Sequence, residues 1–369
     1  MVQDLGMDYA QLGMLIGLYD LPGVFLAFPG GLLGRRFGDK RVVVAGLGLM
    51  AVGGLVMGAS YSYPQAAAGR VLSGMGAILL NVLLTKMITD WFIGREIVLS
   101  LAILVSSFPF GLGLALLTLG PLAAALSWQT VMRLTAALCV AALVLVVAVY
   151  RTPPVANSGQ PARWAGFRLS RRELGLVALA GAIWALFNTG LVTLPSFGTG
   201  FLISVGYTIA AAGALISVMA WIVIPSVQLG GYLAERFRRP NVIMIACFFG
   251  AGLATCLVPY WPYRLALCIA LGLLFGPPPR VILSLPAEVL RSENRGPGMG
   301  IFYTCSYGGM VVLSALAGLS RDVTQNPAAP LVFGGMLLFL AIFVLGLFRA
   351  LQSRNVGMST AQSEGRTGG

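Results

Sequence analysis

Eleven long apolar runs follow one another along this chain, each close to the ~20 residues that a helix needs to cross a bilayer. Strands of a membrane β-barrel would instead alternate apolar and polar residues. The runs therefore predict an all-α polytopic membrane protein. The predicted helices are Tyr9–Leu33, Val42–Ser60, Pro64–Met87, Ile97–Gly120, Trp128–Tyr150, Glu173–Phe197, Tyr207–Leu233, Val242–Val258, Pro262–Pro286, Gly298–Leu319 and Leu331–Phe348.

The small share of charged residues supports the same class. Only 10% of the 369 residues are charged and 58% are hydrophobic, whereas soluble domains carry about 25% charged residues. A net charge of +12 would suggest nucleic acid in a soluble protein. Here the basic residues fall between apolar runs, so we expect topology signals and no nucleic-acid partner. With no histidine and five cysteines lacking CxxC spacing, we expect no metal and no cofactor.

The basic residues also predict the orientation. Of the 24 basic residues, 18 lie in alternate loops and in the C-terminal tail, whereas the opposite set of loops holds only Arg264 and Arg321. Cytoplasmic loops carry such an excess. The first residues carry Asp4 and Asp8 and no basic region, so they do not form a signal peptide. We expect an inner-membrane protein with a cytoplasmic C-terminus.

A loop sequence that occurs twice predicts two equivalent halves. Gly30–Arg41 reads GGLLGRRFGDKR and Gly230–Pro240 reads GGYLAERFRRP. Each places a glycine and then charges between two apolar runs, as a tight turn between membrane helices requires. The predicted parts are a five-helix bundle over residues 1–150, a cytoplasmic linker over 151–172, a six-helix bundle over 173–350 and a disordered cytoplasmic tail over 351–369.

The repeat also predicts that the first half lacks its opening helix. Room for two helices exists between the linker and Gly231, but for one only ahead of Gly31. Two explanations are open, a start codon assigned too late and a naturally shortened protein, and we favour the first. Genomic DNA upstream of Met1 with an in-frame apolar run of about 20 codons would decide between them.

Both loops resemble the signature loop of the major facilitator superfamily. The matching positions are Gly31, Arg36, Gly38 and Lys40, and then Gly231, Glu235, Arg236 and Arg239. The third predicted helix, with Arg70, is similar to the fourth helix of that family. KMITDWFIGRE and SLPAEVLRSENRGPGMGIFYT resemble bacterial transporters of a cyanate-permease-like branch. The resemblance implies two helix bundles that rock about a central substrate site.

The same resemblance assigns a cytoplasmic gate, in which Arg35 departs from the family pattern. The family has an acid at this place that caps a neighbouring helix and pairs with an arginine, and an arginine reverses that favourable charge. We hypothesise that the first-half latch is weak or is rebuilt through Asp39. The expected gate residues are Gly31, Arg35, Arg36, Asp39, Gly231, Glu235, Arg236, Glu288 and Arg295, whereas Lys86 and Asp90 read as an i,i+4 pair.

Charged residues inside the spans are the main functional candidates, because each costs about 2.5–3.5 kcal/mol to insert. Arg70 faces either the cavity or a structural partner such as Asp20. Asp20 is either a proton-coupling carboxylate or a partner of Arg70 or Lys86. Arg280 follows the helix-breaking stretch Gly276–Pro279 and either binds an anion or extends to the cytoplasmic surface.

Uncharged polar residues within the spans complete the predicted substrate cavity. Cavity lining and hydrogen bonding between helices are both consistent with such residues. They are Asn81, Asn188, Thr189, Tyr303, Ser306 and Tyr307.

These patterns favour secondary transport of a small organic solute, with an anion drawn by Arg70 and Arg280. No Walker loop is present, which disfavours ATP-driven pumping. We expect the bilayer, the solute and protons as partners, and a monomer. The alternative is a transport-inactive membrane sensor or truncated paralogue. A membrane enzyme is disfavoured, since no clustered nucleophile or metal site stands out.

Overall fold

The computed structural model describes residues 1–92, 96–151, 169–237, 239–291 and 294–364. All regular structure in these ranges is helical. The first bundle contains α1 (Tyr9–Gly17), α2 (Leu21–Phe37), α3 (Asp39–Gly58), α4 (Tyr63–Phe92), α5 (Ile97–Ala125) and α6 (Trp128–Val149). The second contains α7 (Arg171–Thr193), η1 (Leu194–Gly198), α8 (Thr199–Ser204), α9 (Ile209–Phe237), α10 (Pro240–Leu257), α11 (Arg264–Phe275), α12 (Pro278–Val289), α13 (Arg295–Thr324) and α14 (Ala329–Glu364).

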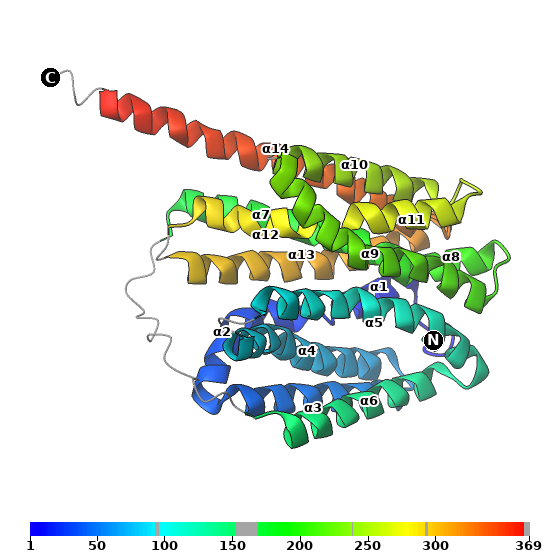
Figure 1. The fold of residues 1–369 in the computed structure, drawn as a ribbon. Coiled ribbons are helices and arrows are strands. Elements are labelled where there is room, and N and C mark those ends of the chain that lie inside the picture. Colours follow the sequence, from blue (N-terminus) through cyan, green and yellow to red (C-terminus); the bar gives the residue numbers. More distant parts are fainter. Residues whose placement is uncertain (93–95, 152–168, 238, 292–293, 365–369) are drawn as a thin grey trace.

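The two bundles, called the N-half (α1–α6) and the C-half (α7–α14), lie side by side with their helices nearly parallel (Figure 1). The described helices include eleven long and apolar enough to cross a membrane, five in the N-half and six in the C-half. The predicted all-α membrane class is confirmed. Most of the predicted linker lies outside the described residues. The final helix, α14, continues into the segment predicted as a tail.

Three of the predicted runs are interrupted in the structure. The run Tyr9–Leu33 is divided between α1 and α2 at Leu18–Asp20, and α2 begins at Leu21 with Pro22 in its first turn. The predicted break beside Arg280 is confirmed, because α11 ends at Phe275 and α12 begins at Pro278. The run from Glu173 passes through the π-helical turn η1 into α8. Proline removes a backbone donor, which explains the first two interruptions.

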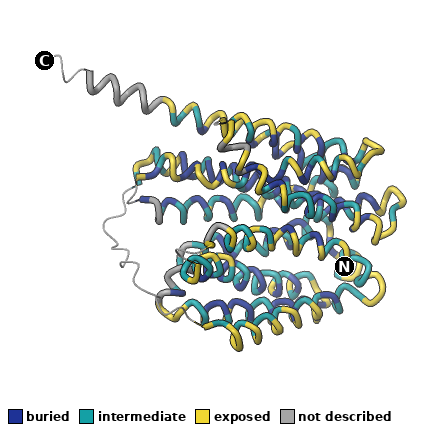
Figure 2. The backbone as a smooth tube through the Cα atoms, viewed as in Figure 1, coloured by how far each residue is buried: buried dark blue, intermediate teal, exposed yellow. Residues whose placement is uncertain are grey.

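The buried core is better developed in the C-half. One continuous cluster there includes Phe187, Phe248, Phe275, Phe302 and Phe348, whereas the N-half has two smaller clusters. Exposed positions follow the outer flanks of both bundles (Figure 2). Many of them are large apolar side chains. Such surface needs no protein cover in a bilayer, where lipid is as apolar as leucine.

Small residues allow the halves to approach along two seams. In the first seam, α1 and α2 cross α13. A Cβ added to Gly13 would lie 2.2 Å from the carbonyl oxygen of Ser314, and one added to Gly318 would lie 1.8 Å from the carbonyl oxygen of Tyr9. In the second, α5 packs on α9, and a Cβ on Gly213 would lie 2.2 Å from the Leu116 carbonyl oxygen. Close backbone packing of this kind is the usual way in which membrane helices associate.

We name the two ends of the bundles by the linker. At the linker end, α6 ends and α7 begins. At the far end, α1 begins and α13 ends (Figure 1).

Candidate functional site

Arg70 of α4 is held by the interruption between α1 and α2. Its Nε donates to the carbonyl oxygen of Leu15 at 3.2 Å, and its guanidinium lies 4.7 Å from the centre of the Tyr19 ring. One turn along α4, Gly74 leaves room for the Tyr19 carbonyl, since a Cβ there would lie 2.2 Å from that oxygen. The break thus supplies both the acceptor and the ring that orient the guanidinium.

Asp20 lies at the same break, immediately before α2. Arg70 is within electrostatic range of its carboxylate. Ion pairs within 4 Å in the described part of the chain do not include these two residues. The direct Arg70–Asp20 ion pair that the sequence left open is therefore not formed, and the terminal nitrogens of Arg70 remain without a described acceptor.

Two tyrosines of α13 face this break from the other half. The rings of Tyr303 and Tyr307 are stacked, with centroids 6.0 Å apart and an interplanar angle of 24°. Tyr307 packs on Gly23 of α2, where an added Cβ would lie 2.4 Å from the ring, and its side chain also interacts with Asn81. Asp20 is within electrostatic range of Tyr307. The structure thus brings five predicted residues together at the first seam, namely Asp20, Arg70, Asn81, Tyr303 and Tyr307.

Three other predicted cavity residues are hydrogen-bonded or buried within the C-half. The buried hydroxyl of Ser306 donates to the carbonyl oxygens of Phe302 and Gly181, at 2.6 Å and 3.2 Å. Asn188 donates to a carbonyl of its own helix, and Thr189 is buried. In this conformation Ser306 and Thr189 lie in helix packing. The Ser306 bond to Gly181 joins α13 to α7, which is the interhelical alternative that the sequence left open.

Arg280 is exposed near the start of α12. None of the hydrogen bonds or ion pairs found among the described residues involves its side chain. Arg280 is therefore not part of the group around Arg70, and its role as an anion ligand stays a prediction.

The first-half loop is held within the N-half. Asp39 Oδ2 lies 2.5 Å from Nζ of Lys86, and Lys86 also lies 3.9 Å from Asp90, the predicted i,i+4 partner. The other Asp39 oxygen, Oδ1, is buried against Gly34 without a described partner. Arg36 is exposed beside the Phe37 ring. The sequence did not predict the Asp39–Lys86 pair, because 47 residues separate the two.

Glu288, an expected gate residue, pairs with a residue outside the expected gate. Its carboxylate pairs with Arg349 of α14, and Arg349 also donates to the side-chain oxygen of Asn241 at 2.7 Å. The sequence did not predict this pair, although the place of Arg349 directly after the apolar run Leu331–Phe348 was a signal. The side chains of Arg35, Glu235 and Arg295 lie outside those that the structure describes, and so does the exposure of Gly31 and Gly231.

At the far end, a carboxylate of the C-half binds the first turn of α1. Asp322 accepts hydrogen bonds from the backbone N–H groups of Tyr9 and Ala10, at 3.1 Å and 2.6 Å. Arg321 lies 3.6 Å from the centre of the Tyr9 ring. Free N–H groups at a helix N-terminus attract a carboxylate. Sequence reasoning missed this contact between the halves.

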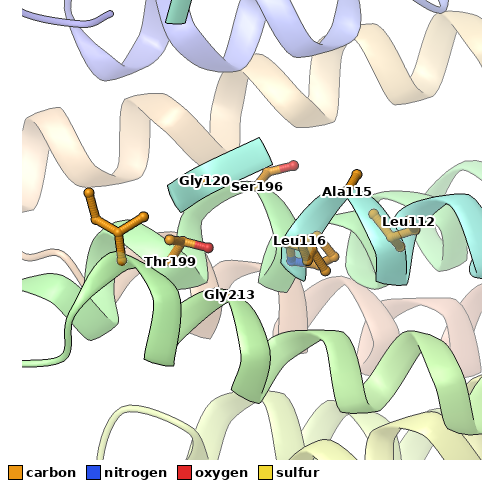
Figure 3. A pocket seen from close by; sticks show the side chains of 9 residues that line it. Leu112, Ala115, Leu116, Gly120, Ser196, Thr199 and Gly213 are labelled. Atoms are coloured by element: carbon orange, nitrogen blue, oxygen red, sulfur yellow. The ribbon is translucent and has the colours of Figure 1, made fainter. Parts of the chain in front are cut away.

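The second seam contains a cavity of about 270 Å³ that was also not predicted. Leu112, Leu116 and Gly120 of α5 line it on one side, and the hydroxyl-bearing side chains of Ser196 and Thr199 line it on the other (Figure 3). No charged residue is among its lining residues. Ser196 belongs to η1, and such π-helical turns are frequent at functional sites.

Comparison with known proteins identifies the fold. The model of the Major Facilitator Superfamily matches residues 1–276 and 201–364. This chain belongs to that superfamily. It is therefore a multi-pass membrane transport protein rather than an enzyme, and the branch within the superfamily stays a prediction.

Similar proteins agree with the assignment. The uncharacterized transporter YycB of Bacillus subtilis is 25% identical over 357 residues, covering 93% of this chain and 84% of that protein. The nucleoside transporter NupG superposes with a TM-score of 0.72 at 15% identity, covering 95% of this chain and 92% of that one. A D-xylose-proton symporter superposes with a TM-score of 0.70 at 15% identity, covering 91% and 87%. At such identities the two structures establish the fold alone.

Proposed function

We propose that this member of the Major Facilitator Superfamily transports a small organic anion by alternating access and that proton movement accompanies transport. It acts as a monomer in the inner membrane, with its C-terminus in the cytoplasm. The observation that carries the proposal is the oriented guanidinium of Arg70, whose terminal nitrogens have no described carboxylate partner at the seam between the halves.

Arg70 is suited to a carboxylate or a similar planar anion. A guanidinium presents parallel N–H donors that match two oxygens of one anion. Its Nε is already bonded to Leu15 and its face covers Tyr19, so little rotational freedom remains to be lost on binding. Tyr303 and Tyr307 supply flat walls and hydroxyl donors from the other half. A bound anion would therefore touch both halves, as coupling to their relative movement requires.

Asp20 is the proposed proton carrier. Burial disfavours the ionised form of its carboxylate, and the nearby positive charge of Arg70 acts in the opposite direction. An anion bound to Arg70 would offset that positive charge, and the carboxylate would then take up a proton more readily. Anion and proton would enter the site together, which keeps its total charge constant.

Uptake into membrane vesicles tests this function. A panel of small carboxylates would be measured with and without a proton gradient, using wild type, Arg70→Gln, Arg70→Lys and Asp20→Asn. We expect Arg70→Gln to abolish uptake, Arg70→Lys to retain part of it, and Asp20→Asn to lose the response to the gradient. Arg133→Gln is the control, since Arg133 donates to the Gly58 carbonyl within the N-half, away from this seam. Anion uptake by Arg70→Gln at the wild-type rate would exclude the assigned role.

A further inference from the structure

A second site lies on the lipid-facing flank of the C-half, away from both seams. A groove of about 550 Å³ runs between α9 and α11 at the far end. Its floor includes Ala211, Ala214 and Val218 of α9, and Leu265 of α11 forms an edge. Tyr263 and Arg264 stand at its mouth. The groove is therefore apolar along its length and basic at one end.

The groove exists because small side chains of α9 face large ones of α11. Ala211 and Ala214 are exposed and leave a hollow beside Leu265, whose exposed fraction is 52%. Ile269 and Leu273 continue an exposed apolar stripe along α11, one and two turns further on. Four-residue spacing keeps these side chains on one helix face. An extended hydrocarbon chain can lie along such a groove and cover apolar surface on both helices.

Arg264 is oriented at the mouth without a carboxylate partner among the described residues. Its Nε donates to the Val258 carbonyl at 3.3 Å and its Nη1 donates to the Tyr207 hydroxyl at 3.4 Å. The rings of Phe201 and Tyr207 lie 5.8 Å and 5.6 Å from the guanidinium. These contacts leave Nη2 unbonded, and the positive charge is not balanced by any described ion pair.

Exposed aromatic residues place Arg264 at the depth of lipid headgroups. Tyr260, Trp261 and Tyr263 form the turn that precedes α11, and Tyr260 and Tyr263 have exposed fractions of 68% and 69%. Tyrosine and tryptophan concentrate where the apolar core of a bilayer meets water. A phosphate at this depth lies directly above an acyl chain.

We propose that this groove binds an anionic phospholipid, with the phosphate on Arg264 and an acyl chain along Ala211, Ala214 and Leu265. The unbalanced positive charge of Arg264 favours an anionic headgroup over a zwitterionic one. A zwitterionic headgroup would bring an ammonium group beside Arg264, where the described residues offer no acid. A headgroup with a net negative charge avoids that repulsion. The site is independent of the proposed substrate site, since it lies within one half and faces lipid.

Native mass spectrometry of the purified, delipidated chain tests the proposal. Phosphatidylglycerol, phosphatidylethanolamine and inorganic phosphate would be titrated separately. We expect tighter binding of phosphatidylglycerol than of phosphatidylethanolamine, and about tenfold weaker binding to Arg264→Gln, the loss typical of one charge-assisted hydrogen bond. Arg264→Lys should bind between the two. Ala214→Phe should weaken lipid binding by filling the groove without changing the charge.

Arg133→Gln is the matched control. Arg133 also lies near the far end and donates its Nε to a backbone carbonyl, that of Gly58, at 3.0 Å. It should bind phosphatidylglycerol as wild type does. Equal losses in Arg133→Gln and Arg264→Gln would indicate an unspecific charge effect and would overturn the site. An Ala214→Phe variant with wild-type lipid binding, together with an Arg264→Gln variant that loses inorganic phosphate, would indicate a free-anion site and overturn the lipid assignment. Wild-type binding by both groove variants would overturn it altogether.

Discussion

The far end and the linker end of this transporter use carboxylates differently. At the far end, Asp322 of the C-half binds the first backbone N–H groups of α1 in the N-half. At the linker end, the described ion pairs stay within one half, Asp39 with Lys86 and Glu288 with Arg349. The halves are thus joined by charge at one end, while the described charges of the other end stabilise each bundle separately.

Carboxylate contacts between the halves and carboxylate contacts within one half should have different effects on the protein. Under the proposed alternating access, a carboxylate between the halves would be released when the far end opens, and its strength would contribute to the balance between conformations. A pair inside one half moves as part of a rigid body and leaves that balance unchanged. Substitutions at the two ends should therefore separate effects on conformation from effects on stability.

The largest expected effect comes from adding bulk at the first seam. In Gly318→Leu, the new Cβ would lie 1.8 Å from the Tyr9 carbonyl oxygen, where no side chain fits. Overpacking of this kind costs about 1–3 kcal/mol or more, and we expect α1 and α13 to separate. Spin labels at Tyr61 and Tyr260, exposed far-end positions of the two halves, would report a longer distance in double electron–electron resonance.

Gly346→Leu is the control for this substitution. Gly346 lies on α14 with nothing within 4 Å of the Cβ that would be added. It should leave the distance between the labels unchanged. A Gly318→Leu variant with the wild-type distance would contradict the close packing of α1 on α13.

Asp322→Asn should open the far end to a smaller degree. Removing the negative charge weakens two hydrogen bonds to the N-terminus of α1, and hydrogen bonds to charged groups contribute about 1.5–3 kcal/mol. A loss near the lower figure shifts the population about tenfold toward the open state. The same pair of labels would show a larger long-distance component.

Asp4→Asn is the control for charge at this end. Asp4 accepts a hydrogen bond from the indole of Trp128 at 2.7 Å, within the N-half. We expect no change in distance between the labels. If Asp4→Asn and Asp322→Asn broadened the distances equally, the far-end contact would have no special role.

Asp39→Asn should have the smallest effect. Lys86 is 40% exposed, so solvent screens the pair and its contribution stays below about 1 kcal/mol. We expect a slight fall in thermal stability and no change at the far end. Transport by Asp39→Asn would be measured in parallel, to test the hypothesis that Asp39 replaces the acid that Arg35 displaces in the first-half loop. If transport and the conformational balance were both unchanged, that hypothesis would fail. A longer far-end distance would contradict the assignment of this pair to one rigid half.

The spans were predictable because crossing a bilayer is a local property of about 20 residues. Arg70 and Asp20 could also be selected as functional candidates, since a charge inside an apolar run is costly and is usually retained for a reason. The break at Leu18–Asp20 was missed although Pro22 marks it, because the run appeared continuous in hydropathy. The place of Ser306 stayed open, because one sequence cannot show which side of a helix faces a neighbour and which faces a cavity.

The sequence by itself determined that this chain is a helical membrane protein in two halves with a few costly charges inside. Only the tertiary structure decided which partners those charges have. Asp322 lies more than 300 residues from Tyr9, and Arg349 lies 61 residues from Glu288. Hydropathy measures the preference of each residue for lipid over water. The contacts of Asp322 and Glu288 depend instead on how α1 packs against α13 and on where α12 lies relative to α14. The small residues Gly13 and Gly318 set the crossing of α1 and α13, which brings Asp322 to the first turn of α1.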